Sequence, residues 1–160
     1  MNNEKKIENV IYKQLIFLNM NKKNKIDIFD YIANKAKEIN LINNIGKFIK
    51  SLEKREKIMP TNIGNLIGIP HGQSDSVNKP FIAFMRLEKE IDWINYDSEK
   101  VKLIFMIGVP EINASKIHLK IISELSKKLI DEDFKNMLLH EIDQNIIYEK
   151  LNSIKIKEEK

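Results

Sequence analysis

The chain has 160 residues, of which 42% are hydrophobic and 31% are charged, a balance typical of a soluble globular domain with a real core. The absence of cysteine excludes structural disulfides, thiolate metal sites and cysteine nucleophiles, and it fits a cytoplasmic protein. The net charge of +4 comes from lysines mixed with glutamates along the chain, so the composition does not indicate nucleic-acid binding.

The apolar segments are too short for a membrane protein. The longest apolar run, Leu103 to Pro110, is far shorter than a bilayer span, and the N-terminal MNNEKKIENV lacks the apolar core of a signal peptide. We therefore expect no direct membrane insertion and a cytoplasmic location.

The first half of the chain predicts a strand, two helices and a second, short strand. Residues 9–19 predict the first strand, and apolar residues at helical spacing predict helices that begin near Asn24 and Asn44. Arg55 follows the apolar stripe of the second helix by three positions, so it should lie at the edge of the buried face. Residues 60–65 then predict a turn-rich link, followed by a short strand at 66–69.

The second half predicts two strands and three helices. The strands lie at 80–87 and 101–109, and the second is so apolar that it should be central and covered on both faces. A long helix is expected at 113–130, with Asp131 and Asp143 capping two more, and residues 153–160 are expected to fray. This order predicts an α/β, three-layer fold with a mixed central sheet and helices on both faces, as one domain over 1–152.

The histidines are the main candidates for chemistry. His71 follows the apolar run LIGIP where a strand ends, a position at which binding and catalytic residues concentrate, whereas His118 lies beside the apolar stripe of a helix. His140 lies near a helix end and is assigned no chemistry. The local pattern leaves open that His71 is an inert loop residue, His118 a core residue and Arg55 part of a solvated face. Since metal-ligand spacing, a phosphate loop and a GxSxG elbow are all absent, no metal or nucleotide cofactor is expected.

The segment REKIMPTNIGNLIGIPHG, residues 55–72, resembles the fructose/mannitol-type (type 2) enzyme IIA domain of the bacterial sugar phosphotransferase system (PTS). That family carries an Arg-Glu pair, a Thr-x-x-Gly turn and an apolar strand ending in Pro-His. The corresponding residues of this chain are Arg55, Glu56, Thr61, Gly64, Pro70 and His71.

The resemblance extends over residues 9–152. VNKPFIAFMRLEKEIDW and VKLIFMIGVPE resemble the next two family strands, and IHLKIISELSKKLIDEDF resembles the helix with a second histidine, here His118. The chain departs from the family pattern at Asn62 and Leu66, where many members have glycine, and at Gly68, where many have alanine. These departures concern the backbone geometry of the loop and remove no group expected to do chemistry.

The resemblance implies a phosphocarrier with a phosphohistidine intermediate. His71 would accept a phosphoryl group on Nε2 from phospho-HPr and pass it to a cognate enzyme IIB, which phosphorylates a sugar, expected to be of fructose type, through the membrane component IIC. Arg55 would stabilise the phosphate, His118 would donate a hydrogen bond to it, and Thr61 would give weaker support from the loop. Two alternatives remain: a regulatory protein similar to the nitrogen-related enzyme IIA, which acts by phosphorylation-dependent protein binding, and a binding module without phosphotransfer.

Overall fold

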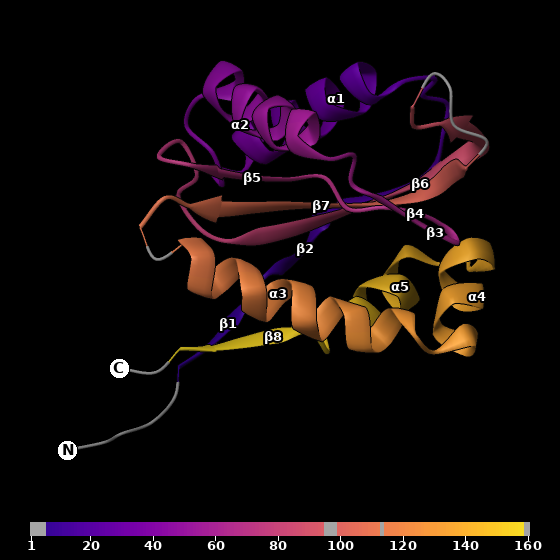
Figure 1. Ribbon diagram of the computed structural model, residues 1–160. Coiled ribbons are helices and arrows are strands. Elements are labelled where there is room, and N and C mark those ends of the chain that lie inside the picture. The colour runs from indigo at the N-terminus through magenta and orange to yellow at the C-terminus, as the bar shows by residue number, and fades with distance from the viewer. Residues whose placement is uncertain (1–5, 95–98, 113, 159–160) are drawn as a thin grey trace.

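A computed structural model describes residues 6–94, 99–112 and 114–158 of the chain (Figure 1). Its elements in chain order are β1 (Lys6–Asn9), β2 (Ile11–Met20), α1 (Lys25–Glu38), α2 (Ile45–Ile58), β3 (Asn62–Gly64), β4 (Leu66–Gly68), β5 (His71–Ser74), β6 (Phe81–Asp92), β7 (Lys100–Pro110), α3 (Ala114–Leu129), α4 (Glu132–His140), α5 (Gln144–Leu151) and β8 (Lys155–Glu158).

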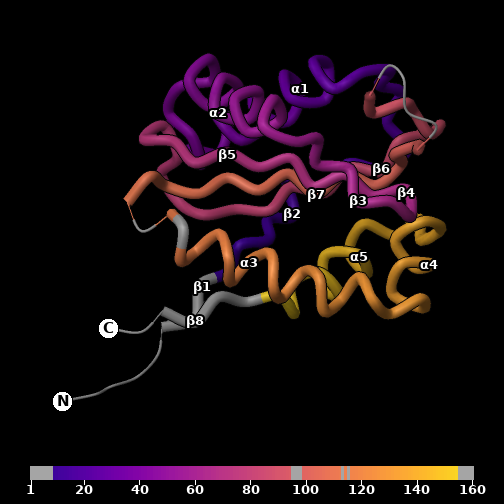
Figure 2. The backbone as a smooth tube through the Cα atoms, viewed as in Figure 1, coloured from indigo at the N-terminus to yellow at the C-terminus, as the bar shows by residue number. Residues whose placement is uncertain are grey.

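A six-stranded mixed sheet forms the middle layer, in the order β2-β6-β7-β4-β3, with β5 also paired to β7. The strand β4 runs parallel to the first part of β7, and β5 runs parallel to its last part, where His71 is opposite Ile107. The strand β3 pairs antiparallel with the other edge of β4, and it does not pair with β5. Among the described strands, β5 therefore forms an open edge of the sheet, between α2 and β7 in the trace (Figure 2).

Helices cover both faces of this sheet, as the sequence predicted. Figure 1 shows α1 and α2 on one face and α3, α4 and α5 on the other. Side chains of β6 alternate between the two sides: Phe81, Ala83 and Met85 join the core under α1 and α2, whereas Ile82 and Phe84 join the core over α3 to α5. The predicted central strand, β7, is buried along nearly its whole length. The three-layer α/β prediction is confirmed.

Side-chain caps fix the helix starts at the predicted places. Asn24, Asn44, Asp131 and Asp143 each accept a hydrogen bond from a backbone N–H of the first turn of the helix that follows. These bonds satisfy amide groups that have no partner inside the helix. No helix within the described ranges is long and apolar enough to cross a membrane.

Two short strands were not predicted near the candidate site. Part of the turn-rich link forms β3, which pairs with β4 through a tight turn in which Asn65 and Leu66 have φ of 55° and 69°. His71 was expected where a strand leaves the core, but it is the first residue of β5. A strand of three or four residues is defined by its hydrogen-bonded neighbour, so its own sequence carries little signal.

The prediction of a frayed tail at 153–160 is wrong over Lys155–Glu158, which form β8. This strand pairs antiparallel with β1 as a separate two-stranded sheet. The charged sequence of β8 gave no sign of pairing because its partner lies at the opposite end of the chain. The predicted strand at 80–87 is also too short, since β6 continues to Asp92 along β7 after an irregularity in register.

Candidate active site

His71 is held in one orientation by the backbone just before it. Its Nδ1 lies 2.9 Å from the carbonyl oxygen of Ile69. Because a carbonyl oxygen only accepts, Nδ1 carries the hydrogen, and Nε2 keeps a free lone pair in the neutral ring. His71 is 9% exposed, and burial lowers its pKa, with a smaller contribution from Arg55.

The second histidine packs directly against the first. The rings of His71 and His118 are stacked with centroids 4.4 Å apart. The His118 Nε2 is buried and has no hydrogen-bond partner among the described residues. Burial, together with the positive electrostatic influence of His71 and Arg55, lowers the pKa of His118 to about 4. Both rings are therefore neutral at pH 7, and the unpaired Nε2 of His118 lies in the ring that stacks on His71.

A cavity of about 330 Å³ opens next to these rings. Its lining consists of Ser51, Lys54, Arg55, Ile58, His71, Gln73 and His118. The α2 members have the spacing of one helical face, so one side of the cavity is the last two turns of α2.

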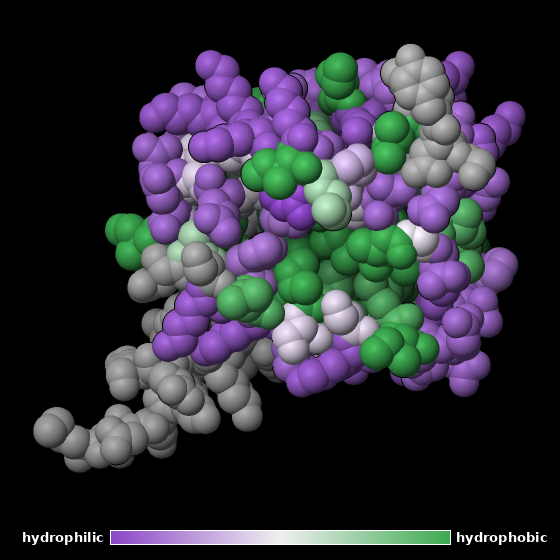
Figure 3. Space-filling view, in the orientation of Figure 1, coloured by the Kyte–Doolittle hydropathy of each residue, from purple (hydrophilic) through white to green (hydrophobic). Residues whose placement is uncertain are grey.

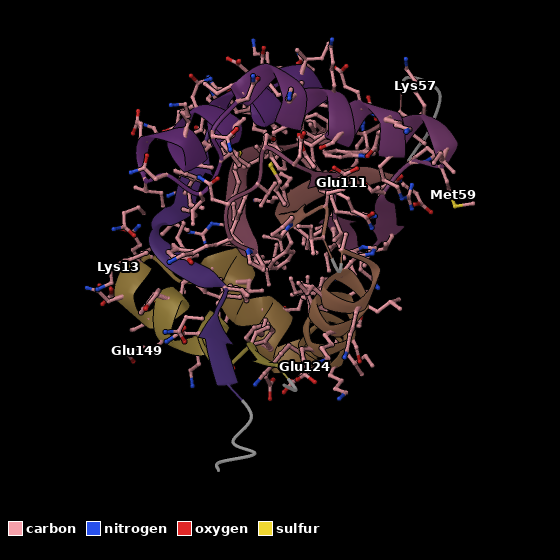
Figure 4. All side chains as sticks on the ribbon, turned by 90° about the vertical axis from the view of Figure 1, so that its left-hand side faces the viewer. Lys13, Lys57, Met59, Glu111, Glu124 and Glu149 are labelled. Atoms are coloured by element: carbon pink, nitrogen blue, oxygen red, sulfur yellow. The ribbon has the colours of Figure 1, made fainter. Side chains whose placement is uncertain are left out.

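A larger cavity of about 720 Å³ lies elsewhere, and its charged lining includes Glu124 and Glu149. Figure 4 shows both residues in the helical layer opposite Lys57 and Met59.

Arg55 lies in the last two turns of α2, on the side of the cavity beside His71, and it is at the edge of the buried helix face, as predicted. Its Nη1 donates a hydrogen bond of 2.7 Å to the carbonyl oxygen of Met59, just beyond the helix end. The remaining guanidinium N–H groups are available to an anion in the cavity.

A close contact between α2 and β5 determines the position of this side of the cavity. A Cβ added to Gly72 would lie 2.2 Å from the Ser51 hydroxyl oxygen, so glycine at this position leaves room for the Ser51 side chain. Since side chains alternate along a strand, Gly72 faces α2, and the neighbouring His71 faces α3 and His118. The open sheet edge thus brings groups from both helical layers to one place.

Thr61 lies outside the lining of this cavity and contacts Glu56 instead. The Thr61 hydroxyl donates to Glu56 Oε2 at 2.7 Å, and its backbone N–H donates to Oε1 at 2.9 Å. Trp93 Nε1 donates to the same Oε1 at 2.7 Å. Thr61 is thus positioned to support the loop through Glu56, and the third partner of this carboxylate, Trp93, is itself buried.

The sequence therefore identified three residues that the structure brings together, namely Arg55, His71 and His118. It missed the other cavity-lining residues, Ser51, Lys54, Ile58 and Gln73, although helical spacing from Arg55 would have found Ser51 and Ile58. His140 lies at the end of α4, and its ring bonds to the Asn136 carbonyl. Among the described residues, no group of three or more His, Asp or Glu side chains is arranged to hold a metal ion.

Comparison with known proteins agrees with this geometry. Residues 9–154 match the family model described as phosphoenolpyruvate-dependent sugar phosphotransferase system, EIIA 2. The fructose-like EIIA component of Escherichia coli K12 is 31% identical over 129 residues, covering 81% of this chain and 84% of that protein. The fructose-specific EIIABC component of Bacillus subtilis is 31% identical over 92% of this chain, which spans 23% of that longer protein.

A solved structure shares the whole fold. The nitrogen regulatory protein IIA-Ntr from Neisseria meningitidis superposes with a TM-score of 0.77 at 25% identity, over 89% of this chain and 96% of that one. The family match extends over all the strands of the six-stranded sheet and over every residue that lines the histidine cavity. The chain belongs to the type 2 enzyme IIA family of the phosphoenolpyruvate-dependent sugar phosphotransferase system.

Proposed function

We propose that the chain is a phosphocarrier that accepts a phosphoryl group on His71 Nε2 from phospho-HPr and passes it to a cognate enzyme IIB for sugar uptake of the fructose type. The observation that carries this proposal is the stacked pair of neutral histidines beside Arg55, in one cavity at an open sheet edge. The proposal treats residues 1–152 as one enzyme IIA domain that acts in the cytoplasm, where phosphoenolpyruvate is the phosphoryl source.

The groups at the cavity suit nucleophilic attack on phosphorus. Neutral imidazole is a good nucleophile at neutral pH, and the Ile69 carbonyl leaves Nε2 as the attacking nitrogen of His71. Arg55 offers a fork of donors that matches phosphate oxygens. His118, protonated on its unpaired Nε2 in the neutral ring, would donate to a phosphoryl oxygen and so gain the partner that it lacks.

The surface near the cavity suits contact with other proteins. Ile58, which lines the cavity, is 77% exposed, and Leu119, next to His118, is 66% exposed. Figure 3 shows apolar side chains gathered between the two helical layers on this face. Exposed apolar surface of this kind marks protein-binding sites, here for HPr and enzyme IIB in turn. The fused EIIABC relative of Bacillus subtilis supports a partnership with IIB and, through it, IIC.

The test is phosphoryl transfer from labelled phosphoenolpyruvate, with enzyme I and HPr supplied. Wild type should acquire an acid-labile, alkali-stable label, and His71→Ala should acquire none while keeping the wild-type circular dichroism. His140→Ala is the matched control, because it removes a histidine remote from the cavity and should label normally. A label on His71→Ala would overturn the assignment, and no label on wild type, with a working control acceptor, would favour the binding module.

A regulatory role is the second candidate, favoured by the fold shared with the nitrogen regulatory protein. Both roles use the same phosphohistidine, so the second step separates them. Mixing the labelled chain with enzyme IIB partners of the fructose type should move the label to IIB if the chain serves transport. Stable label in the presence of competent IIB proteins would favour regulation.

A further inference from the structure

The cavity beside His71 contains a second cation that the sequence did not identify. Lys54 and Arg55 are consecutive residues of α2, and both line the cavity. Lys54 forms no ion pair with any of the described residues, whereas Lys47 of the same helix pairs with Asp75. The ammonium of Lys54 is therefore available to an anion at the cavity.

The charge of a phosphoryl group on His71 calls for such a cation. A phosphate monoester carries about 1.5 to 2 negative charges at neutral pH, and a phosphoryl group on nitrogen is comparably charged. Arg55 offsets one of these charges, and His118 is neutral before phosphorylation because its pKa is about 4. Lys54 is the second cationic side chain among the described residues that line the cavity.

We propose that Lys54 is a catalytic residue, which binds the phosphoryl group on His71 as a second cationic ligand beside Arg55. The inference rests on the proposed function and assigns the same site one more residue. The guanidinium of Arg55 has a fixed planar geometry, whereas the ammonium of Lys54 ends a flexible four-carbon stem. Lys54 can thus follow the phosphoryl group as it arrives and leaves.

Phosphorylation by phosphoramidate, a small-molecule donor, distinguishes phosphate binding by Lys54 from a contact between Lys54 and a partner protein. In phosphoramidate the P–N bond to ammonia breaks while the bond from phosphorus to His71 Nε2 forms. The phosphoramidate nitrogen is already protonated to –NH3⁺ in the reacting form, so ammonia leaves as a neutral molecule with the electron pair of the broken bond, and the Nδ1 proton stays on the phosphorylated ring, held by the Ile69 carbonyl. The variants are Lys54→Gln and Lys54→Arg, with Lys57→Gln as the matched control. Lys57 is on the same helix but lines a different groove with Lys25 and Glu53.

The initial rate of phosphorylation by phosphoramidate, followed by phosphorus NMR, should fall about tenfold in Lys54→Gln, the effect of one charge-assisted hydrogen bond. Lys54→Arg should recover most of the rate, and Lys57→Gln should stay within twofold of wild type. A Lys54→Gln rate equal to wild type with phosphoramidate, but slower with phospho-HPr, would mean that Lys54 contacts the partner, and would overturn the proposal. An equal fall of the phosphoramidate rate in Lys57→Gln would also overturn the proposal, because the loss of any positive charge on α2 would then explain the effect. Failure of wild type to be labelled by either donor would instead refute the proposed function.

Discussion

At the scale of single residues, the two stacked histidines give the site a pH dependence with a definite sign. The unfolded chain binds protons on histidine near the usual pKa of 6.5, whereas folded His118 stays neutral down to about 4, and the pKa of His71 is lowered too. The unfolded state therefore binds more protons between these values, so the free energy of unfolding should fall as pH drops from about 6.5 to about 4. Urea unfolding at several pH values measures this.

The matched comparison is His118→Asn, which removes the more strongly shifted histidine. Its loss of stability between pH 7 and 5 should be smaller than that of wild type. Identical pH profiles for the two proteins would show that His118 titrates normally in the folded state and is not desolvated beside His71.

Glu56 should be among the more important residues for stability outside the core. Its carboxylate accepts hydrogen bonds from the Thr61 N–H, the Thr61 hydroxyl and the Trp93 indole. Glu56→Ala leaves these partly buried donors without an acceptor, so it should lower the free energy of unfolding by about 2–4 kcal/mol. Chemical denaturation checks this value, and Glu53→Ala, an exposed carboxylate on the same helix, should change little. Equal effects of the two substitutions would contradict the role given to Glu56.

At the scale of elements, the contact between α2 and β5 should control phosphoryl acceptance. Gly72→Ala places a Cβ against the Ser51 hydroxyl, which must either rotate away from the Phe48 carbonyl or move with α2 from the sheet edge, so the change should cost about 1–3 kcal/mol and slow labelling of His71. Ser51→Ala removes the atom that the new Cβ would meet. The double variant Ser51→Ala/Gly72→Ala should therefore regain part of the stability and part of the labelling rate that Gly72→Ala loses. Gly46→Ala at the start of α2 meets no closer atom than 3.5 Å and should be neutral or stabilising. Additive losses in the double variant would show that this contact is not the constraint.

The elements also show what the sequence can predict. The helices were predicted because a cap and an apolar stripe are local signals, as at Asn44 and Leu52. The strands β5 and β8 were not, because their partners β7 and β1 lie far away in the sequence. The strand β3 was also missed, because its three residues lie in a turn-rich segment and pair only with the neighbouring β4. Among the candidate site residues, His71, Arg55 and His118 follow from a motif and a family resemblance. Lys54 and Gln73 do not, because a cavity lining depends on the packing of α2 against the sheet.

At the scale of the whole molecule, the site lies where the two helical layers meet at the edge of the sheet. Arg55 comes from the layer of α1 and α2, and His118 comes from the layer of α3 to α5. The two cores on either side of the sheet are separate clusters of buried side chains. The distance between Arg55 and His71 therefore depends on one core, and the stacking of His118 on His71 depends on the other.

The ribbon of β1 and β8 should be dispensable for this arrangement. It is a sheet of its own, and none of the described residues that line the histidine cavity belongs to it. Removal of residues 155–160 should therefore leave the rate of phosphoryl acceptance within twofold of the full chain. Removal of 151–160 also deletes Leu151 and Ile154, both fully buried against the α3 side of the sheet, and should cost about 3–6 kcal/mol. Labelling rates and thermal unfolding of both truncations test the distinction. If the shorter deletion abolished labelling while the chain stayed folded, the ribbon would have to hold α3, and with it His118, in place.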